Sequence, residues 1–475
     1  MYLGKQGEMK EIQQERVRQL NEKDVKGGDY VLYWMQEAQR TEYNHALEYA
    51  VQRANEIGQR LLVLFGLTAD YPEANLRHYA FMLEGLRDVE EALQQRGIRF
   101  VVKLGSPDEV ALEFGSHAST IVCDMGYMRP QKGWREKVAS EADCLVAQVE
   151  TEVVVPVELA SDKREHAART LRPKIRRHLD DFLSELEPTV IEHPSLDMAA
   201  EGLDLADIGA ILDGMELDRS VSPVSHLYRG GTSEAKTILD KFIETRFETY
   251  VEHRNQPQTD DVSHMSKYLH YGHISPVYVA LKIRGSGGPQ DDVDSYLEEV
   301  IVRRELSMNF CHYTPDYDSY SNLPGWAKET LEEHKKDPRE YVYSREQLEN
   351  AQTHDAYWNA AMKEMAHTGY MHNYMRMYWG KKILEWSSTP EQAYATTLYL
   401  NNKYFLDGRD PNSFANVAWV FGQHDRGWTE REVYGKVRYM SAGGLERKAK
   451  PDQYVEKVER LVEEGRAEGP AEGPA

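Results

Sequence analysis

A chain of 475 residues, of which 41 % are hydrophobic, is too long for a single core, so we expect two globular domains. Its net charge of −22 argues against a general nucleic-acid binder, which is usually basic, and no apolar run reaches the about 18 residues that a membrane span needs. The N-terminal segment lacks the apolar stretch of a secretory signal, and the three cysteines have no metal-ligand spacing, so we expect a cytoplasmic protein without a metal site.

Short apolar runs alternate with amphipathic helical patterns over residues 28–155. The runs are YVLYWM (30–35), RLLVLFGL (60–67), IRFVVKLG (98–105), STIVCDMG (119–126) and CLVAQVET (144–151). This alternation is typical of a parallel sheet covered by helices on both faces, so we expect a doubly wound, Rossmann-like α/β domain. The first run is not followed by G-x-G-x-x-G, which argues against dinucleotide binding of the NAD type.

A connector, a second domain and a tail are expected to follow. Residues 156–230 are mixed and partly polar, and we interpret them as the interdomain connector. Helical patterns dominate residues 231–460 and strand signals nearly vanish, so this domain is expected to be all-α. It holds six of the eight tryptophans. Residues 461–475 end in the Gly/Pro repeat AEGPAEGPA and are expected to form a disordered tail.

Two basic strips stand out in this acidic chain. RTLRPKIRRH (169–178) has no acidic residue, and KVRYMSAGGLERKAK (436–450) has one. Each is either a solvated face or a surface that contacts phosphates.

The stretch MHNYMRMYWGKKILEW (371–386) places Trp379 and Trp386 seven residues apart. On a helix this spacing puts both rings on one face, about 10 Å apart along the axis. Taken alone, the stretch is typical of a buried core helix.

Five motifs of the second domain resemble those of class II cyclobutane pyrimidine dimer photolyases in order and spacing. They are SHMSKYLHYGHISP (263–276), EEVIVRRELSMNFCHY (298–313), THDAYWNAAMKEM (353–365), the stretch 371–386, and YLNNKYFLDGRDPNSFANVAWVFGQHDRGW (399–428). The resemblance runs from about residue 28 to residue 455. It implies an antenna domain followed by an FAD-binding catalytic domain. It also implies light-driven electron transfer from reduced FAD to a dimer flipped out of double-stranded DNA, performed by a DNA-associated monomer that would be nuclear in a eukaryote.

The resemblance assigns a set of residues to the flavin. Asn401 would face the flavin N5, with its neighbour Asn402 directed elsewhere. Residues 263–267 would begin a helix whose N-terminus suits a diphosphate, although an ordinary helix cap is the alternative. The implied flavin contacts are Tyr250, Ser263, His264, Met265, Ser266, Lys267, Arg376, Asn401 and Asp407.

An electron relay and a lesion site are implied as well. Trp379 would lie nearest the flavin, followed by Trp358 and by Trp386 near the surface, and the three would reduce the flavin under light. Glu299, Met377 and Trp419 would surround the dimer, with a hydrogen bond from the Glu299 carboxyl to a thymine carbonyl and an apolar wall from Trp419.

The rim of the lesion site shows one departure from the family. Arg303 stands where some relatives carry a second Trp, and its guanidinium would either stack on a base or pair with a phosphate. Asp425 and Arg426 resemble a pair that joins the relay to the lesion rim. Arg303, Arg426, Arg438 and Trp419 are the candidate DNA contacts.

Two other functions remain open at this stage. A photoreceptor of the cryptochrome type would share the fold and the flavin but would not repair DNA, and the presence of Glu299, Met377 and Trp419 argues against it. A non-enzymatic nucleotide-binding scaffold would lack the set of motifs. Family members often hold a second, antenna chromophore of the deazaflavin or flavin type, but no residue pattern in 28–155 identifies one.

Overall fold

The apolar runs of the first 155 residues become the strands of one six-stranded sheet in the computed structural model, which describes residues 12–468. The strands are β1 (Val17–Gln19), β2 (Tyr30–Met35), β3 (Arg60–Leu67), β4 (Arg99–Leu104), β5 (Ala118–Asp124) and β6 (Leu145–Val149). Their order is β1-β6-β5-β2-β3-β4, and every neighbouring pair is parallel except β1 and β6. The chain therefore moves outward from β2 to β4, returns, and moves the other way from β5 to β6.

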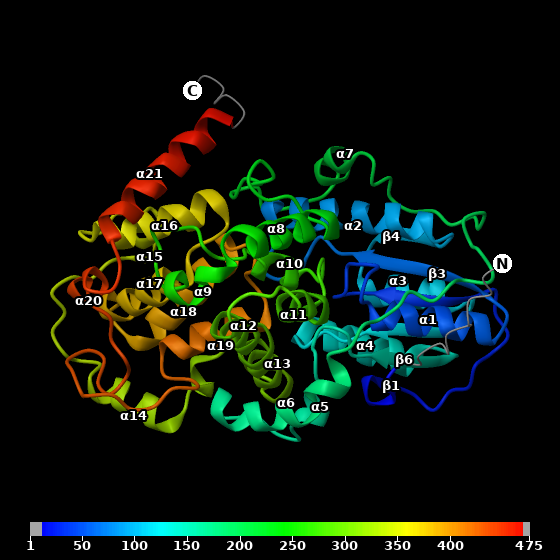
Figure 1. The fold of residues 1–475 in the computed structure, drawn as a ribbon, viewed down its shortest axis with the longest axis horizontal. Helices are drawn as coiled ribbons and strands as arrows, with labels where there is room; N and C mark the ends of the chain where they lie inside the picture. Colours follow the sequence, from blue (N-terminus) through cyan, green and yellow to red (C-terminus); the bar gives the residue numbers. More distant parts are fainter. Residues whose placement is uncertain (1–11, 469–475) are drawn as a thin grey trace.

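Helices cover both faces of this sheet, as the sequence predicts (Figure 1). Val31, Tyr33 and Met35 of β2 lie in the core formed with α1 (His45–Glu56) and α2 (Leu76–Gln95). The alternate residues of β2 lie in a second core with α3 (Pro107–Gly115) and α4 (Arg129–Glu141). All of β2 is buried because a strand buried on both faces has no solvent-facing side chains.

One strand is not predicted from the sequence. The edge strand β1 precedes residue 28 and consists of Val, Arg and Gln, two of which are exposed. Without an apolar run, nothing distinguishes it from a loop until β6 offers it a backbone partner.

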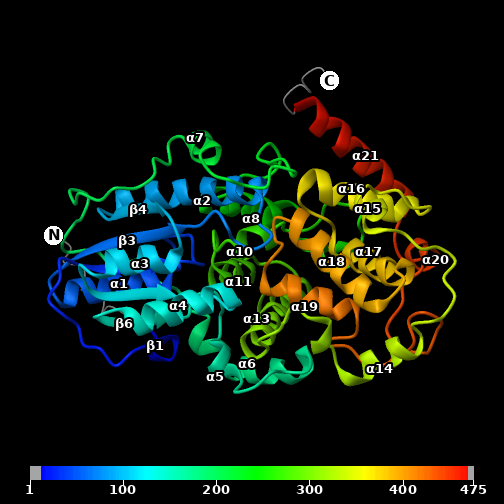
Figure 2. The ribbon, with the colours of Figure 1, turned by 180° about the vertical axis from the view of Figure 1, so that it is seen from behind.

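The second half of the chain is helical, as expected, and lies beside the sheet domain in both views (Figure 1, Figure 2). Its helices are α8 (Thr232–Thr245), α9 (Tyr250–His253), α10 (Ser266–His270), α11 (Pro276–Arg284), α12 (Gln290–Leu297), α13 (Arg304–Tyr313), α14 (Gly325–Glu333), α15 (Arg345–Glu349), α16 (Ala356–Thr368), α17 (Asn373–Trp386), α18 (Pro390–Tyr404), α19 (Pro411–Val420), α20 (Ala442–Glu446) and α21 (Pro451–Glu468). Between residues 12 and 468, none of the helices combines the length and apolar character needed to cross a membrane.

The segment 156–230 contains three helices, α5 (Val157–Ala160), α6 (Ala168–Phe182) and α7 (Ile208–Asp213). Buried residues of α6 join the core of the helical part, whereas those of α7 join the core around α2. This segment therefore packs on both halves of the molecule.

The expectation of a disordered tail from residue 461 is wrong for residues 461–468, because α21 continues to Glu468. Tyr454 and Val458 are buried in the helical core, and Val462 packs against it one turn later. That four-residue apolar spacing extends the helix. Residues 469–475, with most of the Gly/Pro repeat, lie outside the described residues.

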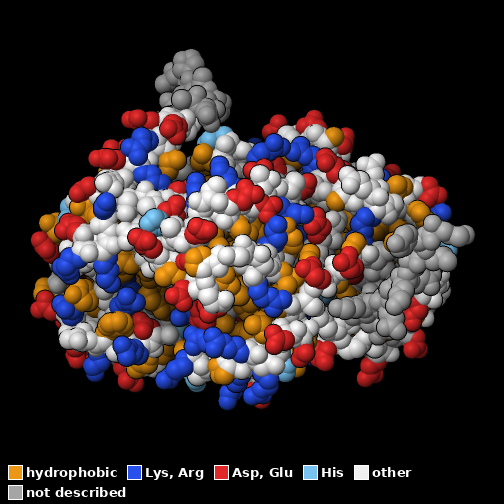
Figure 3. All heavy atoms as spheres, in the orientation of Figure 1, with side chains coloured by type: hydrophobic (Ala, Val, Ile, Leu, Met, Phe, Trp, Pro, Cys, Tyr) orange, Lys and Arg blue, Asp and Glu red, His pale blue; other side chains and the backbone are white. Residues whose placement is uncertain are grey.

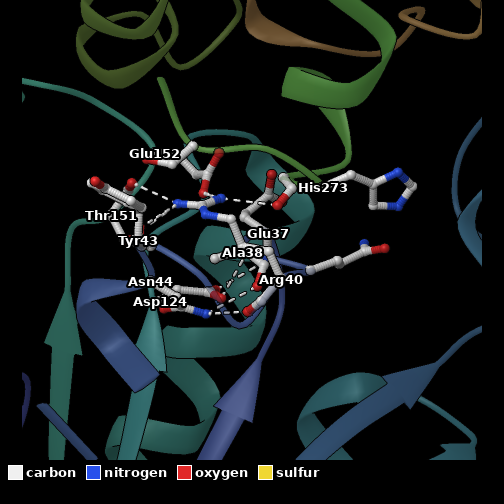
Figure 4. Close-up of polar contacts among 12 residues, drawn as sticks. Glu37, Ala38, Arg40, Tyr43, Asn44, Asp124, Thr151, Glu152 and His273 are labelled. Carbon is white, nitrogen blue, oxygen red and sulfur yellow. Dashed lines mark hydrogen bonds and ion pairs between the residues drawn. The ribbon is translucent and has the colours of Figure 1, made fainter. Parts of the chain in front are cut away.

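A buried arginine ties the two halves together (Figure 4). Arg40 is fully buried and donates hydrogen bonds to the carbonyls of Thr151 (3.1 Å) and Gly272 (2.9 Å) and to the Glu152 carboxylate. Gly272 has a φ of +65°, and a Cβ there would lie 1.9 Å from the Glu37 carbonyl oxygen. The loop after β2 is thus fixed against the helical part, because only glycine permits this approach.

Candidate functional site

An ion pair joins two of the proposed flavin residues. Arg376 on α17 donates two parallel hydrogen bonds to Asp407, at 2.9 and 3.0 Å, and a third to the Met371 carbonyl. Burial alone would raise the pKa of Asp407, but the adjacent Arg376 guanidinium outweighs it and holds that pKa below its usual value. The pair is therefore charged and rigid, which suits the positioning of a planar polar group.

A buried lysine lies next to this pair. Lys267 is 1 % exposed, and its ammonium donates to the His264 carbonyl at 3.1 Å and lies 3.8 Å from the ring centroid of Tyr228. Among residues 12–468 no carboxylate lies within ion-pair distance of it. Burial lowers the pKa of Lys267 to about 7. A buried cation without a carboxylate partner is costly in free energy, and an anion bound beside it would offset that cost.

The segment before α10 differs from its prediction, because the helix begins at Ser266 and has five residues rather than beginning at residue 263. Ser263 accepts a hydrogen bond from Tyr296 at 2.8 Å, and Met265 is 2 % exposed and belongs to the core. His264 has a φ of +56° and contacts Asp260. Burial lowers the pKa of His264, so the ring is neutral near pH 7. Binding of an anion here would rest on Lys267 rather than on a helix end.

The side chains of the two neighbouring asparagines of α18 contact each other. Asn401 is buried, and its amide donates to Asn402 at 3.0 Å. Asn402 in turn donates to Glu73 of the sheet domain at 2.6 Å and accepts from the Arg409 backbone. Asn402 therefore belongs to the contact between the two halves, and its role relative to the flavin stays a prediction.

The three relay tryptophans are brought together. The Trp358 indole donates to the Trp379 carbonyl at 3.0 Å, and the rings of Trp358 and Trp386 lie 5.7 Å apart. The indole N–H of Trp379 is buried and has no partner among the described residues. Trp386 is itself 2 % exposed and lies beneath Tyr343 and the exposed His354, so that one layer of rings separates it from solvent.

The proposed lesion residues lie on three elements. Glu299 is half-buried in η3 (Glu298–Arg303), a π-helical turn, and π turns often mark functional sites. Its carboxylate accepts from Arg254 at 2.6 Å, and the Arg254 guanidinium lies 5.3 Å from the ring centroid of Tyr250. The half-buried Met377 comes from α17, and Trp419 from α19. The sequence analysis does not single out Arg254, although it follows Tyr250 by one helical turn.

Cations surround the indole rings of the proposed rim. The Lys381 ammonium and the Arg438 guanidinium lie 5.2 and 5.9 Å from the Trp419 ring. Arg438 is also 5.0 Å from the Trp428 ring. Arg303 is exposed and forms an ion pair with Glu298 at 3.4 Å. Because its side chain is mostly exposed to solvent, it can reorient toward a ligand.

Asp425 and Arg426 do not bond to each other through their side chains. Asp425 accepts from the Trp428 indole at 3.2 Å, and the Arg426 guanidinium lies 5.4 Å from the Trp428 ring. The two residues therefore meet at Trp428, a residue the sequence analysis does not assign, and not at the relay.

A cavity of about 110 Å³ lies at the carboxyl ends of β2 and β3. It is lined by Trp34, Gln36, Glu37, Gln131 and Arg409, among others, and so by both halves of the molecule. The Trp34 indole N–H and the Gln36 amide are buried there without partners in the described chain. Burial, reinforced by the nearby Asp124 carboxylate, raises the pKa of Glu37 to about 8, so its carboxyl is mostly neutral at pH 7.

The position of the cavity follows from the topology. The strand order reverses between β2 and β5, and open α/β sheets bind ligands outside the carboxyl ends of strands at such a point. Asp124 of β5 accepts hydrogen bonds from the backbones of Gln36, Glu37 and Ala38 and so fixes the loop that forms the rim (Figure 4). No residue pattern in 28–155 predicts this pocket, because it arises from the reversal of strand order and not from a local motif.

Comparison with known proteins identifies the family. A deoxyribodipyrimidine photo-lyase of Methanothermobacter thermautotrophicus is 50 % identical over 455 residues, which span 95 % of this chain and 100 % of that protein. This chain belongs to the DNA photolyase family. The DNA photolyase family model itself matches residues 31–194. The chain is thus an enzyme, a photo-lyase of DNA repair, which rules out the scaffold alternative.

Solved structures agree on the fold. A class III photolyase from Agrobacterium tumefaciens has a TM-score of 0.71 at 18 % identity, and covers 92 % of this chain and 87 % of its own. A photolyase from Sulfolobus tokodaii, solved with two FAD molecules, has a TM-score of 0.67 at 16 % identity and covers 93 % and 94 %. At these identities the likeness confirms the architecture of the photolyase-family chain, a parallel-sheet domain joined to a helical domain.

The basic strip 169–178 forms part of helix α6, which lies at the lower edge of the view in Figure 1. Lys and Arg side chains gather along this edge (Figure 3). Arg172 pairs with Glu298, and Lys174 pairs with Glu165. Arg169, Arg176 and Arg177 are exposed, and they are the residues of the strip available to phosphates.

Proposed function

We propose that this chain repairs cyclobutane pyrimidine dimers in double-stranded DNA as a class II photolyase that acts as a monomer and uses light and reduced FAD. One observation carries the proposal: α17 presents a partly buried ion pair at Arg376, a half-buried Met377 and a buried indole at Trp379 within one turn. A flavin-contacting group, a lesion-contacting group and an electron donor are thus held within a few ångströms by one rigid helix.

The residues around α17 fit an FAD molecule. The ammonium of Lys267 would bind its diphosphate, since Lys267 is buried and has no carboxylate partner in the described chain. Its ring system would lie beside Arg376 and Asp407, with Asn401 and Tyr250 at its edges. When bound, reduced FAD supplies one electron to the dimer on absorbing light.

The relay supplies electrons from the protein side. Trp379, Trp358 and Trp386 follow one another through a 3.0 Å hydrogen bond and a 5.7 Å ring contact. The indole N–H of Trp379 is buried without a hydrogen-bond acceptor in the described chain, which core packing alone does not explain. This unpaired donor supports the proposal that a bound group supplies an acceptor beside Trp379.

The lesion pocket would hold an extruded dimer between Trp419, Met377 and Glu299. Trp419 provides a flat apolar wall, and Arg438, whose guanidinium lies 5.9 Å from the Trp419 ring, favours the adjacent phosphates. Glu299 would lie against a thymine of the dimer, and the Arg254 guanidinium, which donates to its carboxylate at 2.6 Å, would be a donor within reach of a thymine carbonyl. Such a contact acts most strongly when the dimer carries the extra electron.

The cavity at the end of β2 is proposed to hold a second chromophore of the deazaflavin or flavin type. The unpartnered Trp34 indole and Gln36 amide support a planar ligand with polar edges. Gln36→Leu should remove absorption from this second chromophore and leave the flavin spectrum in place. An unchanged spectrum in that variant would contradict the assignment.

The function is tested with protein whose flavin has been chemically reduced. A duplex with one thymine dimer is bound in the dark and then illuminated, and restored thymines are counted by chromatography. Wild type should restore them only in the light, and Glu299→Gln should bind the duplex but restore fewer. A flavin spectrum without any dimer loss would instead support a photoreceptor of the cryptochrome type.

A further inference from the structure

A stack of aromatic rings continues the line of relay tryptophans to the surface. The Trp386 ring lies 5.5 Å from the ring of Tyr343 and 5.2 Å from that of His354. Tyr341 stacks on His354 at 3.7 Å with the planes 16° apart, and it is 37 % exposed. Trp386 is 2 % exposed, and the rings of Tyr343 and His354 connect it to the exposed Tyr341.

Within this stack a phenol and an imidazole form a hydrogen-bonded pair. The Tyr343 hydroxyl lies 2.8 Å from Nδ1 of His354 and also accepts a hydrogen bond from the His354 backbone N–H at 3.0 Å. Because that N–H already donates to the hydroxyl oxygen, the phenolic proton is directed to Nδ1 when the imidazole carries its own proton on Nε2. The backbone of Tyr343 also donates to the Trp386 carbonyl at 3.1 Å, which fixes the two rings relative to each other.

We propose that Tyr343 and His354 form the proton-coupled outer end of the electron relay. The inference rests on the proposed photoreduction of the flavin, in which the light-excited oxidised flavin is the ultimate oxidant and leaves Trp386 short of one electron. Tyr343 gives one electron to Trp386 and its phenolic proton to Nδ1 of His354. Trp386 is then neutral again, Tyr343 is a neutral radical, and His354 is an imidazolium.

The chemistry of phenols explains why the pair is needed. An oxidised phenol is a strong acid, and it releases its proton readily only to a base within hydrogen-bond reach, roughly 2.6–3.2 Å. The exposed His354 can pass a proton on to water. Once the proton has left, the electron cannot return to Tyr343 without it, so the separated charges last longer. A dissolved thiol then restores Tyr343 by supplying one electron and one proton, and the exposed face of Tyr341 and His354 is where it would approach.

The test follows radicals in the flavin-loaded, oxidised protein after a light flash, by transient absorption and by electron paramagnetic resonance with ring-deuterated tyrosine. Wild type should show a Trp radical that is replaced by a neutral Tyr radical, more slowly in D2O. Tyr343→Phe should lose the Tyr radical and keep a shorter-lived Trp radical. His354→Gln, which removes the base, should slow formation of the Tyr radical. Tyr357→Phe is the matched control, since Tyr357 is on α16 beside Trp358 but bonds to Glu446 and Asp452, and its signal should equal wild type.

The outcomes separate this inference from the relay itself. A Trp radical in wild type that never becomes a Tyr radical, or a Tyr radical that survives Tyr343→Phe, overturns the role of Tyr343 and leaves the relay intact. Flavin reduction without any Trp or Tyr radical overturns both. A readout without light is the nitrogen NMR signal of His354: Nδ1 should be an unprotonated acceptor whose shift changes in Tyr343→Phe, and a protonated Nδ1 overturns its role as the base.

Discussion

Replacing Lys267 with Met should stabilise the flavin-free protein and weaken its binding of flavin. Burial lowers the pKa of Lys267 from 10.5 to about 7, and this difference corresponds to about 5 kcal/mol, because each tenfold change in proton affinity is worth 1.36 kcal/mol. The Tyr228 ring, 3.8 Å from the ammonium, offsets about 2 kcal/mol of that cost. With the lost hydrogen bond to His264 included, we expect a net gain of about 2–4 kcal/mol at pH 7.

The gain should depend on pH in a defined direction. Between about pH 7 and pH 10.5 the unfolded chain keeps the Lys267 proton that the folded protein has released, so wild-type stability rises with pH across this window. The advantage of the Met variant should therefore be largest below pH 7 and should shrink toward pH 10.5. Urea unfolding at several pH values measures it.

Flavin binding provides the opposite readout. Loss of a charge-assisted hydrogen bond to the diphosphate, worth about 1.5–3 kcal/mol, should weaken FAD binding by roughly 10- to 150-fold. Lys381→Met is the matched control, because burial also lowers the pKa of Lys381 to about 7, but its ammonium donates to the Val420 carbonyl beside Trp419. Both variants should gain stability, and only Lys267→Met should lose flavin affinity. Equal affinity losses, or none in Lys267→Met, would refute the reasoning.

Three further predictions concern the relay, the pocket and the DNA surface. Trp379→Phe should abolish photoreduction of oxidised flavin, followed spectroscopically, while chemically pre-reduced protein still repairs dimers; photoreduction at the wild-type rate contradicts the relay. Trp419→Ala should remove a stacking surface worth roughly 1–3 kcal/mol and weaken dark binding of a dimer-containing duplex about 5- to 150-fold, with little change for undamaged duplex. Equal losses for both duplexes would sink the pocket assignment. Replacing Arg176 and Arg177 with Gln should lower the slope of log affinity against log salt by up to about 0.9 per lost phosphate contact, and an unchanged slope removes α6 from the DNA surface.

The α/β fold is largely predictable because strands that are buried on both faces require continuous apolar runs in the sequence. All five runs from YVLYWM to CLVAQVET become strands. The edge strand β1 escapes prediction because its residues are polar and its structure depends on β6. The helical continuation to Glu468 is not predicted because the polar, Gly/Pro-containing end of the chain carries no apolar pattern of its own, and the helix is held instead by the core contacts of Tyr454, Val458 and Val462.

The site shows a similar division. The motifs predict which residues lie close together. Arg376 contacts Asp407, and the Trp358 ring contacts the Trp386 ring. What the motifs do not give is burial, which depends on residues far away in the chain. Trp386 is covered by a loop some forty positions earlier, and the cavity beside β2 needs Arg409 from the other half of the molecule.

Light-driven reversal of a thymine dimer is the measurement that tests the central claim most directly. Chemically reduced protein is mixed with an excess of duplex carrying one dimer per molecule, and restored thymines are counted per protein with and without illumination. The account predicts several dimers reversed per protein in the light and none in the dark. Flavin-loaded, reduced protein that binds the duplex yet leaves every dimer intact under illumination would contradict it.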